Sequence, residues 1–542
     1  MRNNENNSEK QLVGGSSWLT FGNIFSRILG ALYIVPWTII IGKYSIKANG
    51  LFSMGYAIYA VFLMIATAGI PTAISNLVAH YNGINEGRIS LRLLKEGNRL
   101  GLLTGLISAI VLVIFAPILS AGHTGLKPVL WSLAPTVFIF PILSMYRGFF
   151  QGNQMMRESA LSQVYEQVAR IVYLLVGTWV TLKQDPNNWQ GAVVQSTFAA
   201  FIGGIIGLIY LIFCFYKDQK FFFIQATKIN KLIKHIHLKK LIIGILKQAI
   251  PFTIVASAIT FYQLIDQYTF FPIMDKIGSF SGGSILNQFS RFNFNANKLI
   301  MIIVPIASSI AATSLPMLSR AFAKKDWLDI RKQIKNIYLL FFIAMFLTAF
   351  GLYGVALPLY SVFYGNTDPN LFAGVRILRI SAIVAIFFGL FTVLSFIVQG
   401  LNKADLALKS LLYGIILKFI FQYPCVYFLH AEGALISTMI GFLYSCCYLF
   451  YKIRRYYKVN ISDITSDVFK INLSSIFVLI ISWGIVILLE NFLPLRRFYQ
   501  LIILLVSVII GAFVGVALLV KFKVAPKLVK GFIPKKFNKT KK

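Results

Sequence analysis

Ionisable residues inside long apolar segments are the first candidates for chemistry in this sequence. A charge in an apolar medium is costly unless it faces a partner, water or a ligand. Six of these residues are basic and two are acidic, and this balance favours an anionic ligand over a cationic one. The bases are Arg27, Arg170, Lys298, Arg376, Arg379 and Lys418, and the acids are Glu166 and Asp266.

Arg27, in the stretch "FSRILG", has no acidic residue within helical reach in its own segment, because Glu5 and Glu9 lie in a polar N-terminal tail. A guanidinium cannot be neutralised by losing its proton. Arg27 must therefore face a partner, a cavity or a ligand. Two interpretations remain, which are a partner on another helix, such as Glu166, and an anionic ligand.

Spacing suggests two ion pairs among the other groups. Glu166 and Arg170 are four residues apart, which places them on one face of a helix. Asp266 and Lys298 fall at similar depths in successive apolar segments, so a pair between them would hold an outer gate shut. Lys418 lies in the middle of its apolar segment and has no simple surface explanation.

Arg376 and Arg379 differ from these groups because they lie in the first turns of an apolar segment, where long side chains reach the interface. We therefore expect them to snorkel. The candidate substrate-binding residues of a cavity are then Arg27, Lys298, Arg170 and Lys418, and the candidate gating or ion-pair residues are Glu166 and Asp266.

Membrane-spanning helices must position these residues. Of 542 residues, 57% are hydrophobic and 13% are charged, and the apolar residues come in blocks of about twenty, the length that crosses a bilayer. This pattern predicts an all-α polytopic membrane protein with about fourteen transmembrane helices. The helices are predicted at residues 17–41, 51–79, 98–121, 128–150, 160–182, 190–216, 241–271, 292–319, 335–363, 372–399, 406–429, 431–453, 470–490 and 498–520.

The basic residues between these helices predict the topology. Alternate loops carry clusters of bases, including seven from Lys217 to Lys240 and nine lysines from Lys521 onward, whereas the opposite loops carry scattered ones. Cytoplasmic loops of membrane proteins are enriched in Lys and Arg. Both termini are therefore expected in the cytoplasm. The net charge of +34 then reflects topology, with contact to membrane lipids and no nucleic-acid partner.

An internal repeat indicates two related halves. Gln151-Gly152 and Gln399-Gly400 each close a helix and lie 248 residues apart, and Arg170 and Lys418 lie 248 apart in the helices that follow. Many transporter folds are built from such repeats. We expect two six-helix lobes and two appended helices. The predicted division is a cytoplasmic N-terminal tail (1–16), an N-lobe (17–216), a basic cytoplasmic linker (217–240), a C-lobe (241–453), helices thirteen and fourteen (470–520) and a basic cytoplasmic tail (521–542).

Several function classes find no support in the sequence. There is no Gly-rich phosphate-binding loop with Lys and Ser/Thr, and no cluster of metal-ligating residues. We therefore expect neither an enzyme nor a bound cofactor or metal. Pro36 and Pro251 lie within apolar segments and are candidate hinges, because proline frees a carbonyl and permits a kink.

Three motifs carry a family resemblance. They are "SRILG" in the first helix, "GIPTAISNLVA" from Gly69 to Ala79, and "RGFFQGNQMM…SQVYEQVARI" from Arg147 to Ile171. The sequence resembles the multidrug/oligosaccharidyl-lipid/polysaccharide (MOP) flippase superfamily, in its polysaccharide-export and stage V sporulation protein B branch. Within this branch it is similar to the MurJ-like lipid II flippases. The motif residues that carry the resemblance are Arg147, Gln151, Gly152 and Gln167, and the repeat adds Gln399 and Gly400.

The resemblance implies a flippase for undecaprenyl-pyrophosphate-linked saccharides in the cytoplasmic membrane of a bacterium. In such flippases two lobes enclose a cationic cavity that alternates between inward-open and outward-open, and the last two helices form a groove for the lipid tail. Arg27 matches the essential arginine of the first helix, and Lys298 matches a basic residue of the eighth, where lysine weakens bidentate phosphate binding. The charges that those proteins carry around the second helix are not evident between Asn49 and Gly69.

The expected activity is transfer of lipid II, the peptidoglycan precursor, from the inner to the outer leaflet, with the cell-wall synthesis machinery as a further partner. Two alternatives remain open. The first is a flippase for another undecaprenyl-linked oligosaccharide, of capsule, teichoic acid or exopolysaccharide. The second is an antiporter of cationic drugs or ions, which the excess of buried bases disfavours.

Overall fold

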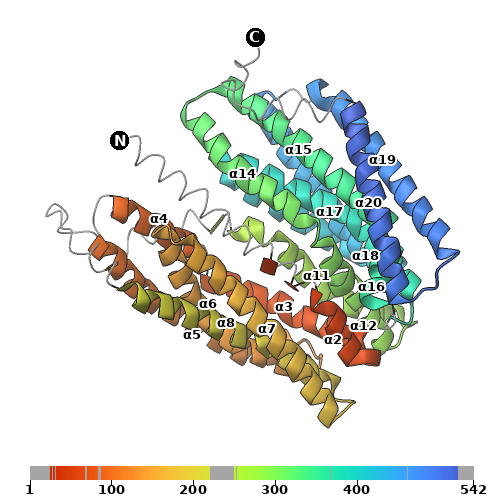
Figure 1. Cartoon of the computed structure of the whole chain (residues 1–542), viewed down its shortest axis with the longest axis horizontal. Coiled ribbons are helices and arrows are strands. Elements are labelled where there is room, and N and C mark those ends of the chain that lie inside the picture. The colour runs from red at the N-terminus through yellow and green to blue at the C-terminus, as the bar shows by residue number, and fades with distance from the viewer. Residues whose placement is uncertain are drawn as a thin grey trace. The chain divides into compact units, whose positions relative to one another are not determined.

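Helices make up almost all of the structure, and no strand occurs among the residues that it describes (Figure 1). The structure is a computed structural model. It describes residues 32–67, 70–83, 87–219, 253–365, 368–459 and 462–522, together with residues 25, 26, 29, 30, 222, 250 and 251. The contacts divide the chain into two compact units, Met1–Thr260 and Phe261–Lys542. Each unit is described by itself.

The helices of the first unit surround one central helix, α6. This helix packs against α3, α4, α5 and α8, while α7 pairs with α8, and α2 packs on α7. Asn188 caps α8, because its Oδ1 accepts a hydrogen bond from the backbone N–H of Gly191 at 2.9 Å. The elements are α2 (Ile34–Ile41), η1 (Gly42–Tyr44), α3 (Ser45–Thr67), α4 (Ile70–Gly83), α5 (Gly87–Leu119), α6 (Leu126–Gly152), α7 (Met156–Gln184) and α8 (Trp189–Lys217).

In the second unit the central helix is α17, which packs against α14, α15, α16, α18 and the π-helical segment η2. The hairpin of α19 and α20 packs on α15 and α16. The elements are α11 (Ala258–Ile277), α12 (Gly282–Ser290), η2 (Arg291–Ala296), α13 (Asn297–Ile300), α14 (Val304–Ala323), α15 (Trp327–Gly354), α16 (Ala356–Tyr364), α17 (Leu371–Gly400), α18 (Ala404–Tyr457), α19 (Ser462–Glu490) and α20 (Arg497–Lys521).

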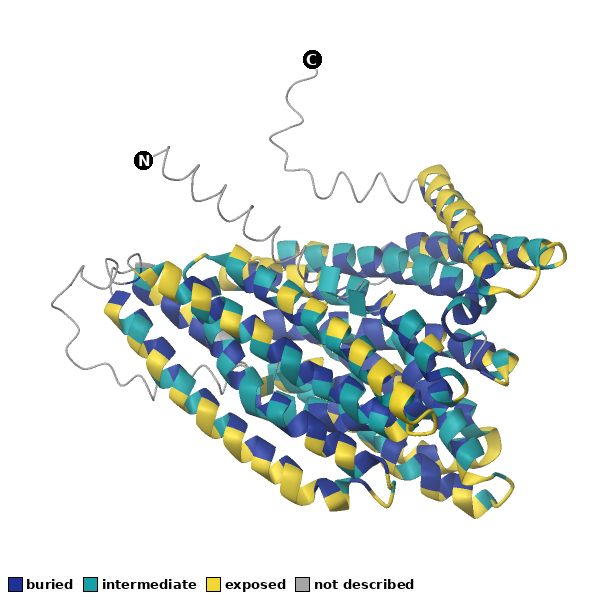
Figure 2. Cartoon of the chain, turned by 60° about the horizontal axis from the view of Figure 1, so that its bottom comes forward, coloured by how far each residue is buried: buried dark blue, intermediate teal, exposed yellow. Residues whose placement is uncertain are grey.

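The outer faces of the long helices carry apolar side chains. On α5, for example, Ile114 and Ile118 are 63% and 72% exposed, and exposed positions recur along the helices in Figure 2. Nine helical segments of the described part are long and apolar enough to cross a membrane, and the bent pair Gly282–Ile300 and Val304–Ala323 makes a tenth. The predicted all-α, multi-span membrane fold is confirmed, whereas the number of fourteen helices stays a prediction.

Helix α7 is absent from these apolar spans although it is 29 residues long. It carries Glu166, Arg170 and several amide and hydroxyl side chains, which lower its hydropathy. Such a helix is suited to face protein or water on one side instead of lipid all round.

Several predicted helices are interrupted in the structure. The predicted helix 292–319 contains η2, α13 and α14, with a bend of 54° before Val304. The predicted helix 335–363 is split after Gly354, four residues before Pro358, whose ring cannot continue a regular helix. By contrast, the two predicted helices 406–429 and 431–453 both lie within α18, where a kink at His430 (φ 53°, ψ −126°) separates two helices.

The segment predicted as one helix at 51–79 is described as α3 and α4. The boundary between the two compact units, at Thr260 and Phe261, falls inside the predicted seventh helix. Most of the predicted linker and both predicted tails lie outside the described residues. The domain boundaries that the sequence suggests therefore stay a prediction.

Candidate functional site

Arg27, the central residue of the "SRILG" motif, lies outside the residues that the structure describes. The described residues that follow it lie against α7, the polar helix of the first unit. A Cβ at Gly30 would lie 3.5 Å from Nε2 of Gln167, and α2 packs on α7. The role of Arg27 itself stays a prediction.

Glu166 of α7 pairs with Arg147 of α6. The Nη2 of Arg147 donates to Oε2 of Glu166 at 2.6 Å, and its Nε donates to the hydroxyl of Ser162 at 3.0 Å. The side chains of Arg147 and Glu166 are 16% and 12% exposed. The pair with Arg170 that the four-residue spacing suggests is therefore wrong, because packing of α6 against α7 brings a closer base to the carboxylate.

Arg170 instead donates from Nη2 to the phenol of Tyr56, a residue of α3. Its guanidinium also lies 5.2 Å from the centroid of the Tyr56 ring. Such a contact orients the guanidinium through a hydrogen bond and a cation–π interaction. Because the phenol is neutral, it leaves the positive charge of Arg170 in place.

The remaining motif residues of the first unit hold helix ends together. Gln151 donates from Nε2 to the hydroxyl of Ser159 at 2.9 Å, across the turn between α6 and α7. Gly152 approaches α4 so closely that a Cβ would lie 2.6 Å from the carbonyl oxygen of Ser75. Only glycine fits this contact. The Gln-Gly motif thus packs the end of α6 between its neighbours.

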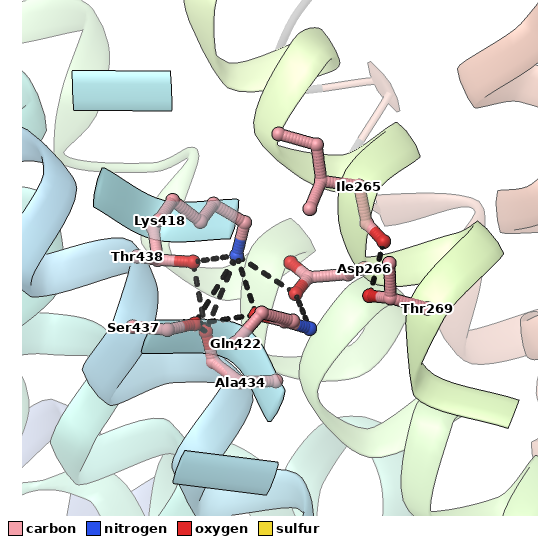
Figure 3. A network of polar contacts seen from close by, with 8 residues as sticks. All are labelled: Ile265, Asp266, Thr269, Lys418, Gln422, Ala434, Ser437 and Thr438. Atoms are coloured by element: carbon pink, nitrogen blue, oxygen red, sulfur yellow. Dashed lines mark hydrogen bonds and ion pairs between the residues drawn. The ribbon is translucent and has the colours of Figure 1, made fainter. Parts of the chain in front are cut away.

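In the second unit, Lys418 of α18 lies at the centre of a buried polar network (Figure 3). Its Nζ lies 2.8 Å from Oδ1 of Asp266 on α11 and 2.6 Å from the hydroxyl of Thr438. Gln422 donates to the same carboxylate oxygen at 2.9 Å and accepts from Ser437 at 2.5 Å. The network joins α11 to both halves of α18.

This arrangement bears on two predictions. Asp266 pairs with Lys418, so the expected pair between Asp266 and Lys298 is wrong. The Lys418 ammonium has three protons and is 0% exposed, and it already contacts a carboxylate and a hydroxyl. A bound substrate would reach Lys418 only after this network opened.

Lys298 lies at the second residue of α13 and is partly buried. Its Nζ lies 5.4 Å from the centroid of the Phe294 ring, one turn earlier in η2. The structure thus places this predicted base directly after the π-helical segment. Such segments often occur at functional sites.

The two glutamines of the internal repeat differ in their surroundings. Gln399 is 3% exposed, and neither polar atom of its amide has a hydrogen-bond partner among the described residues, whereas Gln151 is bonded to Ser159. The carbonyl of Gly400 accepts from the hydroxyl of Ser319 on α14 at 3.1 Å. The repeat in sequence therefore does not extend to equal side-chain contacts.

A buried cluster around Arg291 is missing from the sequence-based candidates. The guanidinium donates from Nη2 and Nε to Oδ1 of Asp368 at 2.7 and 3.2 Å, and from Nε to Oδ2 at 3.0 Å. Tyr360 donates to Oδ2 at 2.8 Å and accepts from Asn295 at 2.9 Å. Only a glycine at 374 leaves room for the Tyr360 ring, since a Cβ there would overlap the ring carbons.

Sequence spacing hides this cluster because Arg291 precedes the predicted helix 292–319 and Asp368 falls in a predicted loop. Both residues are less than 10% exposed in the structure. The one available signal is the set of three asparagines in "RFNFNAN", which is unusual at the start of an apolar helix.

Arg376 and Arg379 lie at different positions on α17. Arg376 is exposed and lies 3.5 Å from Glu432, as expected for a residue that reaches the interface. Arg379 lies between the rings of Tyr353 and Trp483, at 5.5 Å from each centroid. The expectation that Arg379 simply snorkels is incomplete, because two aromatic rings hold its guanidinium.

The structure describes only part of the chain around the two candidate hinge prolines. Pro36 is the third residue of α2, and helical backbone bonds occur on both sides of it, from the N–H of Tyr33 to the carbonyl of Leu29 and from the N–H of Trp37 to the carbonyl of Tyr33. Pro251 is described as helical, but the residues just before 250 lie outside the described part. Hinge function at both prolines stays a prediction.

Comparison with known proteins places the chain in a family. Residues 12–322, more than half of the chain, match the family described as "Polysaccharide biosynthesis protein". The chain is 30% identical over 457 residues to the lipid II flippase MurJ of Bacillus subtilis, and the match covers 82% of this chain and 83% of that protein. Stage V sporulation protein B of the same organism is 29% identical over 231 residues, covering 41% of this chain and 43% of that protein.

Solved structures support the same fold. A lipid II flippase MurJ in an inward-closed conformation superposes with a TM-score of 0.64 at 15% identity, covering 93% of this chain and 98% of that chain. An outward-facing multidrug resistance MATE transporter of the MOP superfamily gives a TM-score of 0.56 at 15% identity, and the match covers 82% of this chain and 95% of that chain. These similarities show the fold.

The family match and the MurJ relative together confirm the resemblance drawn from the motifs. They show a membrane transport protein and not an enzyme. The chain therefore belongs to the family described as "Polysaccharide biosynthesis protein".

Proposed function

We propose that this protein is a lipid II flippase, which moves the lipid-linked peptidoglycan precursor from the inner to the outer leaflet of a bacterial cytoplasmic membrane. The relative named lipid II flippase MurJ supports the proposal, since it is 30% identical over 82% of this chain. The substrate joins a polyprenyl tail to a pyrophosphate and a saccharide. A carrier for it must accept an anion inside the membrane while the tail stays in lipid.

Arg170 is the observation that carries the proposal. It lies in the middle of α7, and its hydrogen-bond partner is the neutral phenol of Tyr56, so its charge is not cancelled by that contact. The nearby carboxylate of Glu166 is engaged by Arg147 at 2.6 Å. A cation held inside a helix bundle in this way suits a pyrophosphate, because it offsets the cost of removing the anion from water.

Arg27 and Lys298 complete the proposed anion-binding set. The described residues that follow Arg27 lie against α7, the helix that carries Arg170. Lys298 adds a point charge after the π-helical segment. Lysine binds phosphate through a single charged centre, so we expect the arginines to provide the bidentate contacts. In this scheme the ion pair of Lys418 and Asp266 is a gating contact that holds α11 against α18 inside the second unit.

The proposed transport cycle is alternating access through a cationic cavity. The anionic headgroup moves outward in the direction that the membrane potential, positive outside, favours. The basic loops predict that both termini lie in the cytoplasm. Membrane lipids surround the protein, and the cell-wall synthesis machinery receives the product.

Depletion of the protein with leaflet-resolved measurement of lipid II tests the proposal in cells. We expect loss of lipid II from the outer leaflet and its accumulation in the inner one. Normal lipid II together with lost surface polysaccharide would show that the substrate is another undecaprenyl-linked oligosaccharide. Unchanged glycans with raised sensitivity to cationic drugs would instead indicate a drug antiporter. Arg27→Ala should abolish complementation at normal protein level, and unimpaired growth would remove Arg27 from the site.

A further inference from the structure

A pocket lined by both polar and apolar side chains lies between α14 and α15, away from the buried charges considered so far. It has a volume of about 330 Å³ and continues into a second cavity of about 380 Å³, which shares Met317, Asp329 and Gln333 with it. The first volume is near the lower end of the range of about 300–1,000 Å³ that is typical of small-molecule sites. Nothing in the proposed transport cycle accounts for this pocket.

The rim of the two cavities is basic. Arg320 and Lys324 line the second cavity and Lys332 lines the first. In the part of the chain that the structure describes, none of these three side chains forms an ion pair or a hydrogen bond. Their charges are therefore available to a ligand. Three unpaired cations around one opening indicate an anion with several charged oxygens.

The wall of the first cavity has a different chemistry. Thr313 and Asn336 line it, together with Asp329 and Gln333, whose Nε2 donates to Oδ2 of Asp329 at 2.6 Å. The Oε1 of Gln333 is buried and has no hydrogen-bond partner among the described residues. An acceptor of this kind requires a donor from a ligand or from water.

These two chemistries together select the class of ligand. A simple phosphate would gain nothing from the carboxylate of Asp329, which repels it. A sugar has hydroxyl groups that donate to carboxylate and amide oxygens. A saccharide that carries phosphate therefore fits both the wall and the rim, whereas a phosphate without such donors fits only the rim.

We propose that the pocket between α14 and α15 binds the saccharide and phosphate of the lipid-linked substrate before it enters the bundle. This inference rests on the proposed function and adds a loading site to it. The six bases from Arg320 to Lys335 place this end of α14 and α15 in the cytoplasm, where the substrate is loaded. Lys332 and Arg320 contact the phosphates, while Asn336 and Gln333 bind sugar hydroxyls.

Binding to the full-length protein in nanodiscs of zwitterionic lipid tests this inference. The probe is a farnesyl-pyrophosphate-linked disaccharide pentapeptide, and inorganic pyrophosphate is a second probe. The double variant Arg320→Gln/Lys332→Gln should raise the Kd of the farnesyl probe about tenfold or more, because two charge-assisted contacts are lost. Asn336→Leu should weaken the binding of the farnesyl probe and leave the affinity for pyrophosphate unchanged. The matched control is Lys325→Gln, which removes one charge from the same loop but lines neither cavity.

The outcomes separate the inference from the proposed function. Binding of the farnesyl probe to the wild type, with equal affinity in the pocket variants, would overturn the inference and leave the proposed function standing. Equal competition by phosphatidylglycerol would also overturn it, because the pocket would then be a phospholipid site. Absence of any binding to the wild type would count against the proposed function itself. Because Arg320 and Lys332 are exposed, the double variant should elute from size-exclusion chromatography like the wild type.

Discussion

The ammonium of Lys418 and the carboxylate of Asp266 lie 2.8 Å apart in a buried site, and this contact links residues 152 positions apart in the chain. Each charge is tolerated there because the other is present. Loss of one partner from a buried pair leaves the other charge uncompensated, which is the most damaging change such a site can undergo.

Lys418→Ala should therefore lower the free energy of unfolding by about 3–5 kcal/mol. The double variant Lys418→Met/Asp266→Leu should recover most of this loss, because it removes both charges. Thermal unfolding of the purified protein in detergent measures the effect. The control is Lys409→Gln, an exposed lysine of the same helix whose pair with Asp405 spans 3.7 Å. A single variant as stable as the wild type would mean that water reaches Asp266.

Arg147→Gln tests the second buried pair. We expect the free energy of unfolding to fall by about 2 kcal/mol. This loss is smaller than for Lys418→Ala because solvent partly reaches the side chains of both Arg147 and Glu166. Arg147→Lys should keep the charge but lose the bond from Nε to Ser162. Its stability should therefore lie between those of the wild type and Arg147→Gln. Arg99→Gln breaks an exposed pair and serves as the control. If Arg147→Lys were no more stable than Arg147→Gln, the charge would not be the important feature.

Tyr56→Phe separates the orientation of Arg170 from its charge. The variant keeps the aromatic ring and removes the hydroxyl that Arg170 binds. Transport should fall roughly two- to tenfold at unchanged protein level, as expected for one hydrogen bond. Tyr165→Phe on the exposed face of α7 is the control. Full transport by the Tyr56 variant would show that the phenol does not position the guanidinium.

Gly374→Ala tests the cluster of Arg291, Asp368 and Tyr360. A Cβ at this position would overlap the ring of Tyr360, so the ring must move and its bond to Asp368 must stretch. We expect lower thermal stability by about 1–3 kcal/mol, the usual cost of overpacking. At Gly484 in α19, a Cβ meets no atom within 4 Å. Gly484→Ala should therefore be neutral or slightly stabilising. Equal melting temperatures for the two variants would argue against the tight contact.

The sequence predicts the elements of this fold better than their pairings. Segments of about twenty apolar residues, bounded by basic loops, identify helices because length and hydropathy are local properties. Ion-pair partners depend on how helices rotate against each other, and this is not local. Spacing therefore suggests Arg170 for Glu166 and Lys298 for Asp266, whereas packing selects Arg147 and Lys418. The Arg291–Asp368 pair, 77 residues apart, gives no periodic signal at all.

The most direct test of the account is transport of lipid II by the purified protein in vesicles. Fluorescent lipid II is placed in one leaflet, and its appearance in the other is followed by an impermeant quencher. We predict that lipid II crosses faster than in protein-free vesicles. Arg170→Gln should strongly reduce the translocation rate, whereas Arg99→Gln should translocate lipid II at the wild-type rate. Lipid II that crosses no faster than in protein-free vesicles would contradict the proposed function.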